Sequence, residues 1–107
     1  MRQGYHGETL GALAVTDVAV FRDAYDPLLM RAHLVASPDA RLAAAGESPA
    51  DVAARALAEV RALFESRHEH IAAFIVEPLV QCAAGMAMHD PAYLRGLRAL
   101  CDEIGRA

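Results

Sequence analysis

A carboxylate stands where a long apolar run ends. Residues 71–76 (IAAFIV) are continuously apolar, and Glu77 and Pro78 follow them directly. An apolar run without polar alternation is typical of a parallel strand covered on both faces, and Pro78 cannot continue a sheet ladder. Ligands of open α/β sheets collect at the carboxyl ends of strands. Glu77 is therefore a candidate binding residue, with a solvated surface acid as the plain alternative.

A second group of candidate residues lies near the start of the chain, in the sequence GYHG over residues 4–7. Two glycines flank Tyr5 and His6, which indicates a tight turn whose backbone approaches something closely. An aromatic ring in such a turn can stack on a planar ligand, or it can simply cover the start of the next helix. His6 fits a supporting role at a site and an ordinary turn position equally well.

The other polar residues give weaker signals. His68 and His70 flank Glu69, but this spacing between a helix and a strand is more typical of a polar linker than of a metal site. The two cysteines, Cys82 and Cys101, have no paired spacing, so buried free thiols are expected rather than metal ligands. We therefore predict no metal site.

One helix is predicted from Pro49 to near His68. Ser48 is a favoured N-cap, proline suits the first helical position, and Asp51 stands where a capping-box acid would sit. Its apolar face consists of residues at helical spacing: Val52, Ala53, Ala56, Leu57, Val60, Leu63 and Phe64.

A second helix is predicted from Pro91 to a glycine cap at Gly105, with Asp90 as its N-cap. Its apolar face is again spaced at helical period: Tyr93, Leu94, Leu97, Leu100, Cys101 and Ile104.

The remaining elements are less clearly signalled. A short helix should start at Glu8 or Thr9, residues 17–31 lose periodicity and are expected to be irregular, and residues 32–36 (AHLVA) form a candidate strand. Residues 81–85 are expected to form a loop in which Gln81 makes hydrogen bonds. The order helix, strand, helix, strand, helix predicts an α/β fold with a mostly parallel sheet.

This element order leaves residues 71–76 with too few neighbours. A strand that is apolar on both faces needs a partner on each edge and a cover on each face. Two short strands cannot supply these, so residues 1–107 are predicted to be a single partial domain, a slice of a larger one.

The composition excludes several classes of function. The chain has 107 residues and a net charge of -4, and its basic residues are ten arginines with no lysine. No basic face with stacking aromatics indicates nucleic acid, and no run reaches the roughly 20 apolar residues of a membrane span. We expect a cytoplasmic protein with neither nucleic-acid nor membrane partners.

Four motifs together resemble the class III pyridoxal-phosphate aminotransferases. They are GYHGETLG at residues 4–11, IVEPLVQ at residues 75–81, AGM at residues 84–86 and PAYL at residues 91–94. The resemblance covers nearly the whole chain but a minor part of the family's length. It implies a slice of the parallel-sheet large domain of a pyridoxal-phosphate-dependent transferase, with two or more short strands and three or more helices.

The resemblance also implies roles for the candidate residues. Tyr5 would pack against the cofactor ring and border the substrate pocket, His6 and Gly7 would support it, and Glu77 would lie behind the cofactor. No catalytic residue falls in the chain: the phosphate-binding Gly-Ser segment would precede Met1, and the aspartate that holds the pyridine nitrogen would follow Ala107. The lysine that binds the cofactor covalently is absent, so the isolated chain should be inactive.

Within the family, VEPLVQ at residues 76–81 followed by MAMHDPAYL at residues 86–94 resembles the members that act in biotin synthesis. This implies 8-amino-7-oxononanoate as amino acceptor, 7,8-diaminononanoate as product, S-adenosylmethionine as amino donor, and a homodimer. Two alternatives stay open. One is another class III (omega) aminotransferase, and the other is a self-standing α/β interaction module without catalysis, which pairs with a partner that supplies strands.

Overall fold

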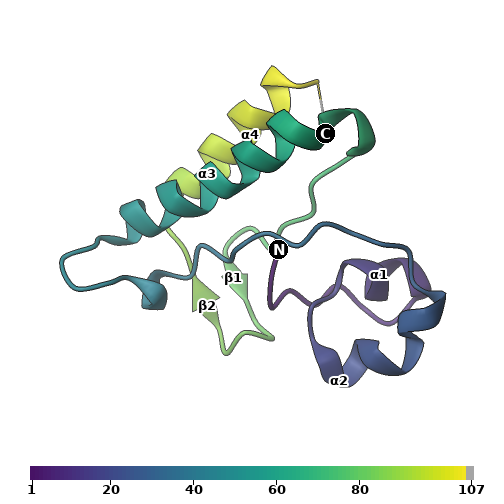
Figure 1. The fold of residues 1–107 in the computed structure, drawn as a ribbon. Coiled ribbons are helices and arrows are strands. Elements are labelled where there is room, and N and C mark those ends of the chain that lie inside the picture. Colours follow the sequence, from purple (N-terminus) through teal and green to yellow (C-terminus); the bar gives the residue numbers. More distant parts are fainter. Residues whose placement is uncertain (106–107) are drawn as a thin grey trace.

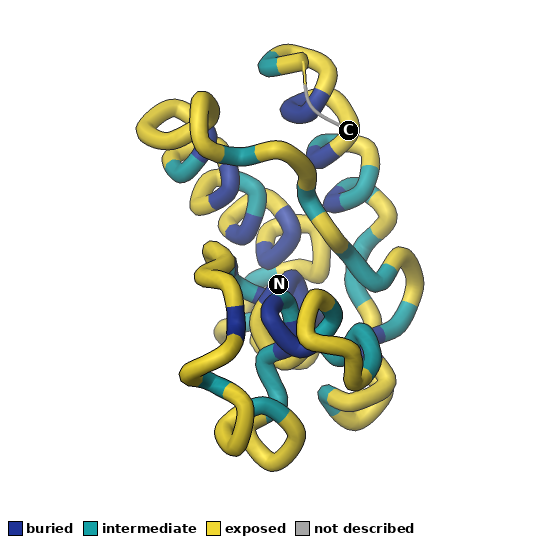
Figure 2. The backbone as a smooth tube through the Cα atoms, turned by 90° about the vertical axis from the view of Figure 1, so that its right-hand side faces the viewer, coloured by how far each residue is buried: buried dark blue, intermediate teal, exposed yellow. Residues whose placement is uncertain are grey.

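Two packed helices form the main layer of the structure (Figure 1). The computed structural model describes residues 1–105, and in it α3 (Pro49–Arg67) lies alongside α4 (Ala92–Glu103). The larger hydrophobic core fills the space between them, with Phe64 and Val60 from α3 meeting Tyr93 from α4. Figure 2 shows buried positions recurring along the helices, while the connecting segments are mostly exposed.

The predicted start of α3 is confirmed. The Ser48 hydroxyl accepts a hydrogen bond from the Asp51 N–H at 3.2 Å, and the Asp51 carboxylate accepts one from the Ser48 N–H at 2.8 Å. This capping box satisfies two of the N–H groups that a helix start leaves unpaired. The helix ends at Arg67, next to the predicted end at His68.

The second predicted helix is confirmed as α4, with its start shifted by one residue. Pro91 is the N-cap position, and the Asp90 carboxylate accepts a hydrogen bond from the Ala92 N–H at 2.8 Å. Gly96 lies against the Leu57 side chain of α3, because a Cβ atom there would lie 2.4 Å from Cδ1 of Leu57. Side-chain volume at position 96 would therefore force Leu57 to move.

The N-terminal part of the chain forms a separate small corner. α1 (Leu10–Val15) follows Thr9, one of the two predicted starts, and the Thr9 hydroxyl caps it by accepting a hydrogen bond from the Ala12 N–H at 3.3 Å. Leu13 and Ala14 of α1 pack with Leu29 in a second, smaller core.

The prediction that residues 17–31 are irregular is wrong in part. They contain α2 (Ala19–Arg22) and the 3-10 helix η1 (Asp23–Leu28). These two helices contain no buried residue, so no periodic pattern of buried positions predicts them. An ion pair between Arg22 and Asp26 at 3.3 Å joins them. Two further 3-10 helices, η2 (Ala40–Leu42) and η3 (His68–His70), flank α3.

The chain is a small α/β unit, as predicted, but its strands are not the predicted ones. Residues 32–36 and 71–76 belong to no strand, and within residues 1–105 the sheet consists of β1 (Val80–Gln81) and β2 (Ala87–Met88). These two strands pair antiparallel, across a turn in which Gly85 and Met86 adopt positive φ angles of 71° and 59°.

The physical reason is a lack of neighbours. A strand needs a paired edge to satisfy its backbone groups, and residues 1–105 place no strand beside residues 71–76. The predicted two-sided burial is therefore also wrong: Ile75 is 46% exposed, and Ala72 and Ala73 are exposed. No described helix is both long enough and apolar enough to cross a membrane.

The Tyr93 hydroxyl gives a test of the helix pair. The Tyr93 side chain is fully buried, its hydroxyl has no hydrogen-bond partner among the described residues, and burial raises its pKa. An unpartnered buried polar group costs stability, so Tyr93→Phe should raise the free energy of unfolding by about 1 kcal/mol in urea denaturation. Tyr25→Phe, at a ring that is 48% exposed, should change nothing. A loss of stability in Tyr93→Phe would show that the hydroxyl is bonded.

Candidate functional site

The candidate site is built on the tight turn at the start of the chain. Gln3 has a positive φ of 59°, and its N–H donates to the Asp17 carboxylate at 2.9 Å. The Asp17 N–H donates back to the Gly4 carbonyl at 2.8 Å. A Cβ atom on Gly4 would lie 3.0 Å from Nε2 of His6, 3.1 Å from the Met1 carbonyl and 3.3 Å from the Glu77 carboxylate. A side chain at position 4 would therefore press against all three atoms.

Glu77 joins this turn to a segment far away in the sequence. Its Oε1 atom accepts a hydrogen bond from the Tyr5 N–H at 3.1 Å, across 72 positions, and its Oε2 atom accepts one from the Cys82 N–H at 3.3 Å. One carboxylate therefore holds two backbone segments together. The structure brings the predicted site residues Tyr5 and Glu77 side by side, with the carboxylate facing the turn's backbone rather than the tyrosine ring.

The Tyr5 side chain makes its own contacts, with Phe21 and Glu8. Its ring lies against Phe21 of α2, with centroids 5.1 Å apart and planes tilted by 50°, and its hydroxyl donates to the Glu8 carboxylate at 3.1 Å. Desolvation of the phenol, together with Glu8, raises the pKa of Tyr5. The ring is half-buried, so it is held at a defined tilt without being closed off from a ligand.

His6 and Gly7 complete the turn. The His6 N–H donates to the Thr16 hydroxyl at 3.1 Å, and that hydroxyl donates to the Ala12 carbonyl of α1 at 2.9 Å. Nε2 of His6 is buried and has no partner among the described residues. Burial lowers the pKa of His6, against the opposing effect of Glu77. Gly7 has a φ of 110°, a conformation that side chains rarely adopt.

Sequence reasoning missed a buried polar network beside the turn. Gln81 is 1% exposed: its amide Oε1 accepts from the Ser37 hydroxyl, and its Nε2 donates to the Arg2 carbonyl at 2.9 Å. Gln81 does make hydrogen bonds, as predicted, but from a strand and not from a loop. The signal that could have located it is a lone amide side chain after the apolar pair Leu79 and Val80.

Arg41 fixes the β1–β2 turn in the same region. Its guanidinium donates to the carbonyls of Ala84 at 2.7 Å and Gly85 at 2.9 Å, and it pairs with the Asp39 carboxylate at 2.7 Å. Asp39 is 3% exposed, and the hydrogen bond from Arg41 lowers its pKa. A buried carboxylate with such a partner stays charged, so the hairpin is tied to residues 39–41 by a charge pair.

These contacts define what the site can hold. Within residues 1–105 no group of three or more His, Cys, Asp or Glu side chains could bind a metal ion. A tilted aromatic ring beside a rigid turn can form one wall for a planar ligand, since aromatic rings stack or meet edge to face. The Glu77 carboxylate sits behind that wall and sets the position of the turn.

Comparison with known proteins identifies the wider family. The family described as Aminotransferase class-III matches residues 1–107. The adenosylmethionine-8-amino-7-oxononanoate aminotransferase of Anoxybacillus flavithermus is 37% identical over 103 residues, which are 96% of this chain and 22% of the relative. The acetylornithine aminotransferase of Methanopyrus kandleri is 34% identical over 102 residues, 95% of this chain and 21% of the relative.

Comparison with a solved structure supports the same family. The omega transaminase of Pseudomonas jessenii in complex with PMP is 28% identical and superposes with a TM-score of 0.79, over 98% of this chain and 23% of that one. The chain belongs to the class III aminotransferases, and it spans about a fifth of the length of the relatives it matches.

The Glu77 bridge can be tested by an isosteric change. Glu77→Gln keeps the shape but replaces one acceptor oxygen with an N–H₂ group, which would face a backbone donor. We expect the free energy of unfolding to fall by about 1 kcal/mol, the low end of the cost of an unpaired group, because Glu77 is partly exposed; urea denaturation measures it. Glu65→Gln on the exposed side of α3 is the matched control and should have little effect. Equal stability of both variants would contradict the bridge.

His6 predicts a pH dependence of known sign. Its pKa in the folded state lies below the ordinary value of 6.5, with burial as the main cause, so the unfolded chain binds a proton more readily. Stability should therefore be complete above pH 6.5 and should decrease as the pH falls below it. His6→Gln should have a shallower decrease in free energy of unfolding between about pH 7 and 5. Identical slopes for the two proteins would show that His6 is not desolvated.

Proposed function

We propose that residues 1–107 are part of the cofactor-binding domain of a pyridoxal-phosphate-dependent aminotransferase that acts in biotin synthesis. In this proposal 8-amino-7-oxononanoate is converted to 7,8-diaminononanoate, with S-adenosylmethionine as amino donor. The observation that carries it is the 37% identity to the Anoxybacillus flavithermus relative of that name over 96% of this chain. The motifs at residues 76–81 and 86–94 lie in the same sequence and point to the same members of the family.

The residues present can contact one side of a bound pyridoxal phosphate, and they do not supply the contacts to its other side. The half-buried Tyr5 ring offers a stacking wall, Gly4 lets His6 and Glu77 pack against the turn, and the buried Nε2 of His6 is unpartnered. When bound, this cofactor supplies the electron sink that loosens the proton next to the donor's amino group. The chain contains no lysine, so the proposal assigns these residues to positioning and gives the isolated chain no transaminase activity.

In this proposal Tyr5 contacts the cofactor ring and borders the substrate, and His6 and Gly7 hold Tyr5 in place. Glu77 acts through the backbone. Its carboxylate accepts a hydrogen bond from the Tyr5 N–H, and this bond fixes the position of the Tyr5 ring. Phe21 fixes the ring's tilt. The chain's own contribution is thus to orient one aromatic wall and to exclude water from one side of the cofactor.

The proposal extends to assembly and location. Several large apolar side chains of the N-terminal corner are exposed, among them Val20 at 82%, Leu28 at 68% and Met30 at 74%. An exposed apolar patch of this kind supports a protein contact, and we assign it to the interface of a homodimer. We place the enzyme in the cytoplasm, where small-molecule amino donors are available.

A second candidate is an omega-type aminotransferase with a different donor and acceptor. The observation that favours it is the superposition on the Pseudomonas jessenii omega transaminase. The two candidates share the cofactor and the role of Tyr5, and they differ in the substrates that the Tyr5 hydroxyl would meet.

A chimera separates these candidates. Residues 1–107 replace the matching segment of the Anoxybacillus flavithermus enzyme, and amino transfer is measured with 8-amino-7-oxononanoate and either S-adenosylmethionine or L-alanine as donor. We expect transfer from S-adenosylmethionine. Transfer from L-alanine alone would favour the omega type, and a folded, cofactor-loaded chimera inactive with both donors would contradict both candidates.

Tyr5 variants of the same chimera test the stacking role. Tyr5→Phe keeps the ring and should retain cofactor affinity while it impairs turnover of the acceptor. Tyr5→Ala should weaken cofactor binding by roughly 1–3 kcal/mol, the range for a lost buried ring, measured by titration of the cofactor's absorbance. Tyr25→Ala is the matched control at an exposed ring. If Tyr5→Ala binds the cofactor as tightly as the parent chimera, the ring is not the wall proposed.

A further inference from the structure

The hairpin of β1 and β2 (residues 80–88) has little apolar packing to hold it in place. Leu79, directly before it, is 72% exposed, and Met86 and Met88 are 63% and 64% exposed. Within residues 1–105, neither hydrophobic core includes a residue of the hairpin. A two-stranded hairpin is marginally stable at best on its own in water. Polar contacts from other segments therefore have to fix its position.

Arg41 supplies such contacts from both sides of its guanidinium group. Nη1 and Nη2 donate to the carbonyls of Gly85 and Ala84, while Nε lies 3.0 Å from each oxygen of the Asp39 carboxylate. The planar fork of an arginine can hold a carboxylate and two carbonyls at once, whereas the single ammonium of a lysine cannot span both. Hydrogen bonds from a charged donor are also stronger than neutral ones.

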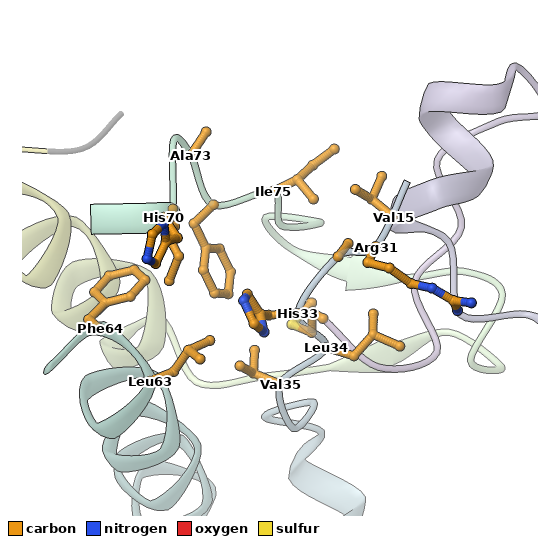
Figure 3. A pocket seen from close by; sticks show the side chains of 14 residues that line it. Val15, Arg31, His33, Leu34, Val35, Leu63, Phe64, His70, Ala73 and Ile75 are labelled. Carbon is orange, nitrogen blue, oxygen red and sulfur yellow. The ribbon is translucent and has the colours of Figure 1, made fainter. Parts of the chain in front are cut away.

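The segment that carries Arg41 is seated in the folded protein. Val35 belongs to the main core, and Asp39 is 3% exposed. The chain before Val35 is held less firmly, since residues 31–33 are exposed and lie across a cavity of about 210 Å³ from residues 73–75 (Figure 3). Arg41 thus reaches the hairpin from a fixed base.

The hairpin in turn carries one end of the Glu77 bridge. The Cys82 N–H donates to Oε2 of Glu77 at 3.3 Å, and the Cys82 carbonyl accepts from the Gly85 N–H at 3.1 Å. The carbonyls that Arg41 holds and the N–H that meets Glu77 therefore belong to one hydrogen-bonded turn. The other oxygen of Glu77 accepts from the Tyr5 N–H, so a shift of this turn would reach Tyr5.

We propose that Arg41 is a positioning residue for Tyr5 and that it acts through the hairpin. Its guanidinium fixes the turn at residues 84–85, this turn sets the Cys82 N–H against Glu77, and Glu77 holds the Tyr5 backbone. The inference rests on the proposed function for what the Tyr5 ring contacts, a bound cofactor. The route from Arg41 to Tyr5 is a property of the chain itself.

The first test is Arg41→Lys in the full chain, which keeps the positive charge and removes the fork. Amide hydrogen exchange is measured by nuclear magnetic resonance at Tyr5 and Cys82, with the α3 amides as the reference for folded protein. Arg55→Lys is the matched control, because the Arg55 guanidinium also pairs with a carboxylate, that of Glu47 at 3.0 Å, outside the hairpin.

We expect Arg41→Lys to speed exchange at Tyr5 and Cys82 about tenfold, the scale of one lost charge-assisted hydrogen bond, with the α3 amides unchanged. Arg55→Lys should leave all of these amides unchanged. In a Glu77→Gln background, Arg41→Lys should still speed exchange at Gly85 and cause no further change at Tyr5, because the bridge between them is already broken.

The chimera with the Anoxybacillus flavithermus enzyme tests the link to the cofactor. Arg41→Lys should weaken cofactor binding about threefold, a modest factor for a residue that acts through others, as measured by titration of the cofactor's absorbance. The same substitution in a Tyr5→Ala chimera should have no further effect.

Several results would overturn the role of Arg41. They are unchanged exchange at Tyr5 in Arg41→Lys, equal acceleration of the α3 amides, the same effect in Arg55→Lys, or a further acceleration at Tyr5 in the Glu77→Gln background. Equal weakening of cofactor binding with and without the Tyr5 ring would also contradict it. A chimera that binds no cofactor with arginine at position 41 would contradict the proposed function instead, and the exchange rates would still decide whether Arg41 positions Tyr5.

Discussion

The hydrogen bonds of the Glu77 carboxylate are the contact on which the arrangement of the site depends. They join the Tyr5 and Cys82 backbones, and the Glu77 carbonyl lies 3.3 Å from Nε2 of His89. The His89 ring in turn meets the buried Tyr93 ring of α4 at 5.5 Å. Hydrogen bonds to a charged acceptor contribute roughly 1.5–3 kcal/mol when buried, and less at a partly exposed group such as Glu77. One residue, through its carboxylate and its carbonyl, thus links the N-terminal turn to the helix core.

The helices could be predicted from the sequence because their signals are local. Ser48, Pro49 and Asp51 form a capping box through contacts within one helical turn, and the apolar spacing along α3 and α4 reports which side is buried. The pairing of Tyr5 with Glu77 was predictable in part, since the carboxyl end of an apolar run is where a distant turn can dock. The carboxylate faces the Tyr5 N–H and not the Tyr5 ring. This orientation depends on the left-handed backbone at Gln3, and a glutamine does not predict such a backbone.

The strands could not be predicted because an apolar run indicates that a segment is covered by neighbours, and it does not say which segments these neighbours are. The apolar run at residues 71–76 indicates burial on two faces, but residues 1–105 cover it only in part. Ile71, Phe74 and Val76 pack against the main core, where the Phe64 ring meets Phe74 edge-on at 6.4 Å. The hairpin of β1 and β2 depends on Arg41 and Gln81, whose partners lie more than 40 positions away. The chain spans 22% of a curated relative and 23% of a solved transaminase.

The amide hydrogen of Tyr5 tests the account most directly, because its only described acceptor is the carboxylate of a residue 72 positions away. The exchange rate of this hydrogen in the intact chain can be measured by nuclear magnetic resonance. The account requires that the Tyr5 amide is protected about as well as the His6 amide, which donates to Thr16. It also requires that this protection is lost in Glu77→Gln. Exchange as fast as that of an exposed loop amide such as Ala45 would contradict it.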